Sequence, residues 1–164
     1  MYTKKYISLI FLEEKMNNNH NSANAELLDK MYKNVKMGSD SMVNIMNKVS
    51  DEGLRRELTA QLTKYESYSK QIRDMIYDCG GKPKEENILT KMGAKMGMAM
   101  NTMTDATTSH IAQMVIEGAT MGMTDMTTAV REYENKNCSE NTLKLARDIA
   151  AFEDNSIDKL KKFL

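Results

Sequence analysis

Glu153 is the residue of this sequence whose type and spacing are best suited to chemistry. It falls midway between Ile149 and Ile157 on the apolar side of the last helical pattern, so an α-helix would turn its carboxylate toward the core. Inward carboxylates and histidines are the usual metal ligands inside helical bundles. The third residue after Glu153 is Ser156, however, and no Glu in the chain stands three residues before a His.

Two further carboxylates, Glu66 and Glu117, complete the set of candidate metal ligands. Helical periodicity places Glu66 roughly 90° from the apolar stripe of its own helix. It places Glu117 on a face that points away from the core, together with His110. Both glutamates are therefore better explained as surface residues. An iron site in this chain would nevertheless have to use them with Glu153, which makes a divergent iron protein the alternative prediction.

An inward carboxylate also needs a partner if no metal is bound. Without one, its burial would cost several kcal/mol, or the group would take up a proton. The same depth of the predicted bundle offers several hydroxyl groups, which with Glu153 form a predicted central polar layer: Ser39, Tyr65, Tyr68 and Ser69. We predict a Tyr–Glu hydrogen bond in this layer, with the volume of the tyrosine ring accommodated by Gly118 and Gly122.

Apolar residues at spacings of three and four predict the helices that hold these groups. The first helix spans about residues 23–49, and the second spans residues 54–79, where Gly80, Gly81 and Pro83 end it.

The stretch from 85 to 135 lacks proline but is too long for one helix of a compact domain. We expect it to divide within 101–108, with Thr104 or Asp105 as the cap of the next helix. Ser139 is the predicted cap of the last helix.

The predicted helices form two antiparallel hairpins, joined by a long crossover that carries a short fifth helix. This arrangement resembles the ferritin-like superfamily, in particular its small bacterial branches. The resemblance covers residues 23–164 and rests on the helix lengths, the crossover and the sequence Gly80-Gly81-Lys82-Pro83. It implies an all-α, antiparallel four-helix bundle with a di-metal centre at mid-depth. Only Glu153 matches an expected ligand position. The other positions carry glycine, serine or tyrosine, so the sequence predicts a degenerate di-metal site and no cofactor.

Residues 1–22 are predicted to be a disordered leader outside the bundle. Lys4 and Lys5 precede a short apolar run and resemble a signal sequence, but Glu13 and Glu14 follow and no cleavage site does. No apolar run is long enough to span a membrane. We interpret residues 12–16 as a translated ribosome-binding site, so that native synthesis would begin at Met16 and residues 1–15 would not be native.

The composition excludes several classes of function. Twenty-three basic residues balance twenty-three acidic ones, which leaves no positive surplus for nucleic acid. The two cysteines, Cys79 and Cys138, lack the spacing of a zinc site or a disulfide framework, which indicates reduced thiols in the cytoplasm. The sequence has no nucleophile–base pair and no phosphate-binding loop that would indicate an enzyme.

Methionine is unusually frequent, with 16 residues in the chain, nine of them between Met92 and Met126. Flexible methionines fill irregular core space, but they also form adaptable partner surfaces, and their thioethers bind Cu(I). Four of them lie off the apolar stripes, so that some should be exposed: Met98, Met100, Met114 and Met121. We therefore predict a structural or protein-interaction module that self-associates, as a dimer, through a Met-rich face, with copper binding as a further alternative.

Overall fold

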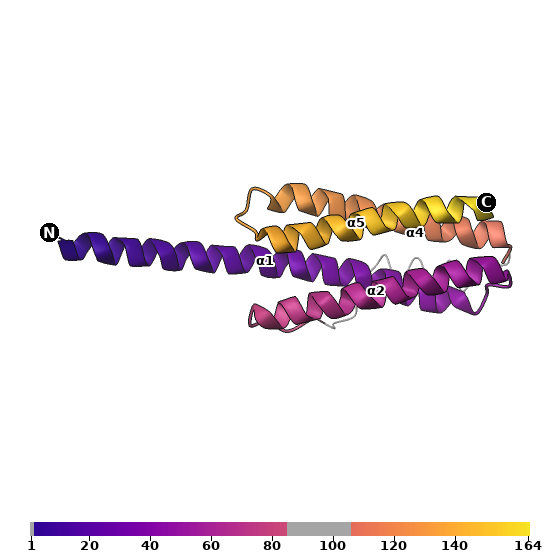
Figure 1. Ribbon diagram of the computed structural model, residues 1–164, viewed down its shortest axis with the longest axis horizontal. Coiled ribbons are helices and arrows are strands. Elements are labelled where there is room, and N and C mark those ends of the chain that lie inside the picture. The colour runs from indigo at the N-terminus through magenta and orange to yellow at the C-terminus, as the bar shows by residue number, and fades with distance from the viewer. Residues whose placement is uncertain (1, 85–105) are drawn as a thin grey trace.

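The computed structural model describes residues 2–84 and 106–164, with side chains from Ser22 onward. It contains four long helices: α1 (Tyr2–Met46), α2 (Glu52–Asp78), α4 (Thr108–Tyr133) and α5 (Glu140–Leu160), the last followed by a short 3-10 helix, η1 (Lys161–Phe163). The α1–α2 hairpin packs against the α4–α5 hairpin to form an antiparallel bundle (Figure 1). The predicted all-α four-helix architecture is confirmed.

Local signals in the sequence set the helix ends. Asp51 accepts a hydrogen bond from the backbone N–H of Leu54 at 2.7 Å and caps α2. At the other end of α2, Gly80 adopts a φ of 75°, and this left-handed turn ends the helix as predicted. Ser139 caps α5 through the N–H of Thr142, which also agrees with the sequence analysis.

The cap of α4 differs from the prediction. Thr107, rather than Thr104 or Asp105, accepts the hydrogen bond of the first turn, from the N–H of His110 at 3.3 Å. All three residues can cap a helix, so composition alone could not choose among them. Thr104, Asp105 and the predicted helix of the crossover lie outside the described residues.

The start of α1 also differs from the prediction. The helix begins at Tyr2 rather than near residue 23, and its N-terminal part extends beyond the ends of the other helices (Figure 1). The segment predicted to be a disordered leader is thus helical from Tyr2 onward. Residues 2–22 contain no proline or glycine, so nothing in the backbone interrupts a helix that continues back from the bundle. That residues 1–15 are not native stays a prediction.

The core lies along the seam that the periodicity predicts. Its fully buried aliphatic side chains come from all four helices, and among the largest are Leu27, Leu28, Met31, Ile45, Leu54, Leu58, Ile72, Ile111, Ile149 and Leu160. Removing their apolar surface from water is the main stabilising contribution to the bundle. None of the described helices has a stretch long and apolar enough to cross a membrane.

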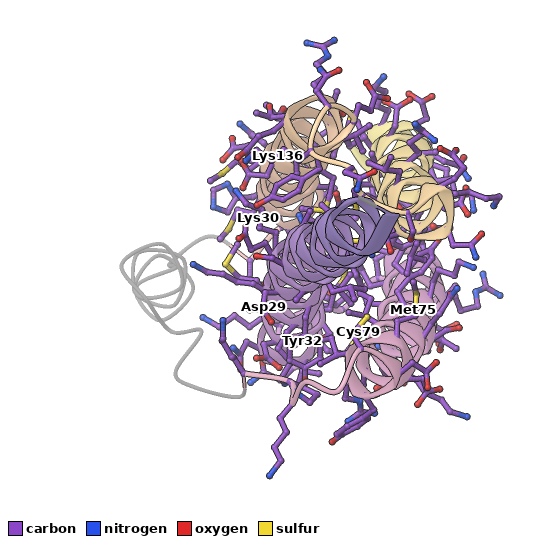
Figure 2. The ribbon with its side chains drawn as sticks, turned by 90° about the vertical axis from the view of Figure 1, so that its left-hand side faces the viewer. Asp29, Lys30, Tyr32, Met75, Cys79 and Lys136 are labelled. Carbon is purple, nitrogen blue, oxygen red and sulfur yellow. The ribbon has the colours of Figure 1, made fainter. Side chains whose placement is uncertain are left out.

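Polar contacts join the two hairpins at the end of the bundle where α4 leads into α5. The hydroxyl group of Tyr133 donates to Glu26 of α1 at 3.0 Å. The ammonium groups of Lys30 and Lys136 lie over the Tyr133 ring, 5.8 and 4.4 Å from its centre. Figure 2 looks onto this end and shows Lys30 and Lys136 near each other, the first on α1 and the second in the turn after α4. These contacts align α1 with α4 and thereby fix the depth of the central residues.

Candidate functional site: the central polar layer

Glu153 is a buried carboxyl group at the centre of the bundle. Its side chain extends inward from α5, and the residue is only 2% exposed. The hydroxyl group of Tyr65, on α2, donates a hydrogen bond to Glu153 Oε1 at 3.1 Å. The predicted Tyr–Glu hydrogen bond is therefore present, and it joins one hairpin to the other.

Two glycines make room for this pair. A Cβ atom at Gly38, on α1, would lie 2.6 Å from the ring of Tyr65. A Cβ atom at Gly122, on α4, would lie 2.8 Å from Glu153 Cδ. Both separations are well inside van der Waals contact, so each glycine permits a close approach that alanine would not.

The prediction that Gly118 and Gly122 accommodate the tyrosine ring was wrong in its assignment. Gly38 accommodates the ring, and Gly122 accommodates the carboxylate. The reason is that Tyr65 packs against α1, its hairpin neighbour, before it reaches α5.

The other predicted members of the layer contact different partners. Tyr68 donates to the backbone carbonyl of Asp148 at 3.2 Å, and Ser39 donates to the carbonyl of Lys36 at 2.9 Å. Ser69 is half-buried. Of the four predicted hydroxyl groups, only that of Tyr65 forms a hydrogen bond with Glu153.

Phe152 supports the two tyrosines from α5. Its ring meets that of Tyr65 edge to face, with centroids 5.0 Å apart, and lies 5.7 Å from that of Tyr68 in a tilted arrangement. Such aromatic contacts contribute stability beyond the area they bury. They hold the Tyr65 ring in position, so that its hydroxyl group stays directed at Glu153.

Asn34 is a member of this layer that the sequence analysis missed. It is 8% exposed on α1, and its side-chain Nδ2 donates to the backbone carbonyl of Gly122 at 3.1 Å. Asn34 precedes Val35, a residue of the predicted stripe, and lies beside that stripe rather than on it. The available signal was its position one turn before Gly38, where the helices approach closely.

Burial controls the protonation of Glu153. The pKa of Glu153 is raised from the ordinary 4.5 to about 8, mainly by loss of water on burial; the hydrogen bond from Tyr65 lowers the pKa in part, and the charge of Asp125 adds to the rise. Burial also raises the pKa of Tyr65 well above its ordinary value, and the proximity of Glu153 adds to this effect. Near neutral pH the layer therefore consists of a neutral carboxyl group and a neutral phenol.

The structure does not bring the three candidate metal ligands together. Glu66 and Glu117 are exposed on the outside of the bundle, whereas Glu153 is inside. Ser156, in place of the family histidine, donates to the carbonyl of Phe152 at 2.8 Å. Within residues 22–84 and 106–164, no three His, Cys, Asp or Glu side chains lie close enough to hold a metal ion.

The space beside Glu153 also fails to fit a di-metal centre. The carboxyl group lies close to the backbone of Gly122 and accepts a hydrogen bond from Tyr65, and one buried carboxyl cannot ligate two ions. The described residues therefore do not fit the metal centre that the fold family implies.

Only part of the methionine prediction can be compared with the structure. Met121 is 44% exposed on α4, as expected. Met114 is half-buried against the core. Met98 and Met100 lie outside the described residues.

A polar groove lies between the C-terminal half of α2 and the N-terminal half of α5. It has a volume of about 450 Å³, and Asn24, Met75, Cys79 and Ser139 are among its lining residues. Figure 2 shows Met75 and Cys79 at this end of the bundle.

The thiol of Cys138 donates to Asn24 Oδ1 at 3.0 Å, and burial raises the pKa of this thiol, so Cys138 stays protonated near neutral pH. Both cysteines are free thiols.

Comparisons with known proteins agree with this architecture. No protein-family model and no curated protein sequence matches the chain. Among solved structures, the Dps1 protein of Mycobacterium smegmatis, determined as a point mutant, is similar with a TM-score of 0.70 and 13% identity, over 87% of this chain and 95% of that one. A dodecameric thioferritin from Bacteroides fragilis, described as bacterioferritin-related, is similar with a TM-score of 0.68 and 12% identity, over 92% of each chain. The chain thus shares the four-helix fold of these ferritin-like structures.

Proposed function

We propose that this protein is a self-assembling ferritin-like module with a structural or protein-interaction role, in which a Tyr–Glu layer occupies the place of the di-metal centre. The observation that carries the proposal is the buried hydrogen bond between Tyr65 and Glu153, enclosed by the glycine contacts on α1 and α4. This arrangement joins helices through protein groups alone, where a metal centre would require several convergent carboxylates.

Metal analysis of purified protein tests the first part of this proposal. We expect the wild-type protein to contain less than stoichiometric iron or copper after exposure to either metal under reducing conditions. Glu153→Ala and the surface variant Glu66→Ala should give the same metal content. Stoichiometric metal in the wild-type protein that is lost in Glu153→Ala would overturn the proposal and establish the alternative, a divergent metal-binding protein.

Self-assembly is the second part of the proposal. The similar thioferritin is dodecameric, and bundles of this fold offer long exposed helix faces on which copies can pack. The predicted contact is the Met-rich face, of which Met121 is the exposed member on α4. A dimer is the smallest assembly that satisfies the prediction, and its twofold symmetry would bring the same surface of both copies together.

Native mass spectrometry and light scattering decide the assembly state. The wild-type protein should have a mass that is a multiple of the 18.7 kDa chain. Met121→Lys should shift it toward the monomer, because a charge would be buried in an apolar contact. Thr63→Lys, at an exposed position of α2 away from this face, is the matched control and should leave the mass unchanged. A wild-type monomer would refute self-assembly.

The proposed location is the cytoplasm. The two free thiols support it, because an oxidising compartment favours the pairing of cysteines. Fractionation of the natural host, with detection by an antibody, would test this location.

A further inference from the structure

Two buried acceptor atoms in the central layer have no hydrogen-bond donor. They are Oδ1 of Asn34 and Oε2 of Glu153, in residues that are 8% and 2% exposed. A buried acceptor that has given up water without gaining a partner is unfavourable, and native structures contain few of them. A single proton placed between two such atoms would satisfy both of them.

Both atoms belong to side chains that contact Gly122. Glu153 Oε2 lies 2.9 Å from the position that a Cβ atom of Gly122 would occupy. Asn34 Nδ2 donates to the Gly122 carbonyl at 3.1 Å. The Gly122 carbonyl can accept a hydrogen bond only from the NH₂ group of the Asn34 side chain, so this bond fixes which way the Asn34 amide is turned. The amide oxygen of Asn34 is left as an acceptor on the other side.

We propose that Glu153 is a neutral carboxylic acid in the folded protein and that its Oε2–H donates to Asn34 Oδ1. One proton then satisfies both unpaired acceptors. The result is a continuous hydrogen-bond chain from the Tyr65 hydroxyl to Glu153, from Glu153 to Asn34, and from Asn34 to the carbonyl of Gly122. The chain connects α2, α5, α1 and α4 in that order, and thus all four long helices of the bundle.

The groups around the carboxyl favour this neutral form. Tyr65 and Tyr68 face it from α2, and both are neutral phenols near neutral pH. Asp125 contributes a negative charge from α4, which opposes a second negative charge at Glu153. On α1, the buried polar side chain that approaches Gly122, as Glu153 does, is that of Asn34, an uncharged amide. Desolvation is the largest effect on the carboxyl and acts in the same direction.

The proposed proton makes the contact between the two hairpins sensitive to pH. Loss of the proton would leave a buried carboxylate facing the amide oxygen of Asn34, so attraction between α1 and α5 would become repulsion. We expect the bundle centre to loosen in mildly alkaline solution while the caps and the apolar seam persist. This inference goes beyond the proposed function, since it holds for a monomer and for any assembly.

Carbon-13 NMR of the Glu153 carboxyl group, followed as a function of pH, tests the proposal. Asn34→Ala should lower the midpoint of the titration by about one pH unit, because it removes the acceptor that stabilises the neutral form. Tyr65→Phe should raise the midpoint, because it removes a donor to the carboxylate. Asn44→Ala, at an exposed asparagine of the same helix, is the matched control and should not change it.

The direction in which Asn34→Ala shifts the midpoint of the Glu153 titration decides the test. A raised midpoint would mean that the amide donates to a carboxylate, and an unchanged midpoint would mean that the two groups are not coupled; either result overturns the proposal. Infrared spectroscopy of the wild-type protein provides a second test that does not depend on the folding of Asn34→Ala. A protonated-carboxyl C=O band should be present at neutral pH and absent from Glu153→Gln, and a spectrum without this band would also overturn the proposal.

Discussion

Replacing Glu153 by glutamine should remove a large part of the dependence of stability on pH. Glutamine has nearly the same shape as a protonated glutamic acid, accepts the hydrogen bond from Tyr65 through its carbonyl oxygen, and offers an NH₂ donor where the acid has its proton. It differs in that it never ionises. The variant therefore isolates the contribution of this one carboxyl group.

The sign of the effect follows from proton linkage. The pKa of Glu153 is about 8 in the folded protein and near its ordinary 4.5 in the unfolded chain. Between these values the unfolded chain binds fewer protons than the folded protein, so stability falls as pH rises. The stability is fully present below pH 4.5 and is lost progressively up to about pH 8.

The expected loss of stability is large relative to the total free energy of unfolding. At 1.36 kcal/mol per unit of pKa, a rise from 4.5 to about 8 corresponds to about 5 kcal/mol in total, approached above pH 8, and roughly 2.5 kcal/mol of this is lost between pH 5 and pH 7. A small domain has a total stability of about 5–15 kcal/mol. The ionisation of one side chain thus removes a substantial fraction of the free energy of unfolding.

Urea unfolding followed by circular dichroism, at several pH values from 5 to 8, measures this difference. The free energy of unfolding of the wild-type protein should fall relative to that of Glu153→Gln as pH rises, until the variant is the more stable at pH 8. Other titrating groups contribute equally to both proteins and cancel in the comparison. Parallel profiles for the two proteins would refute the reasoning, since they would mean that Glu153 ionises normally in the folded state.

Three further substitutions test the packing and the caps by the same unfolding assay. Gly122→Ala gains about 1 kcal/mol of helix propensity, but its Cβ would meet the Glu153 carboxyl group, so a net loss of about 1–2 kcal/mol is expected. Gly38→Ala should displace the Tyr65 ring and cost a similar amount, and an increase in stability for either variant would show that the layer is loosely packed. Ser139→Ala should cost about 1 kcal/mol through loss of the α5 cap, with the folded circular dichroism spectrum unchanged.

The periodicity of the sequence was sufficient to predict the bundle, because the spacing of apolar residues fixes which side of each helix is buried. It also predicted that Glu153 points inward, since a residue midway between Ile149 and Ile157 shares their face. The C-terminal end of α2 and the start of α5 followed from Gly80 and Ser139 for an equally local reason. These features depend on residues within a few positions along the chain.

The partners of Glu153 were decided by the tertiary structure. Four hydroxyl groups stood at a suitable depth, and only the packing of α2 against α1 selected Tyr65 and assigned Gly38 to its ring. Asn34 was missed because its role depends on the backbone of Gly122, which is 88 residues away in the sequence. Sequence spacing determines the direction of a side chain from its own helix, whereas the distance to a group on another helix depends on how the helices pack. The inward carboxyl was therefore predictable, and the hydrogen-bond chain around it was not.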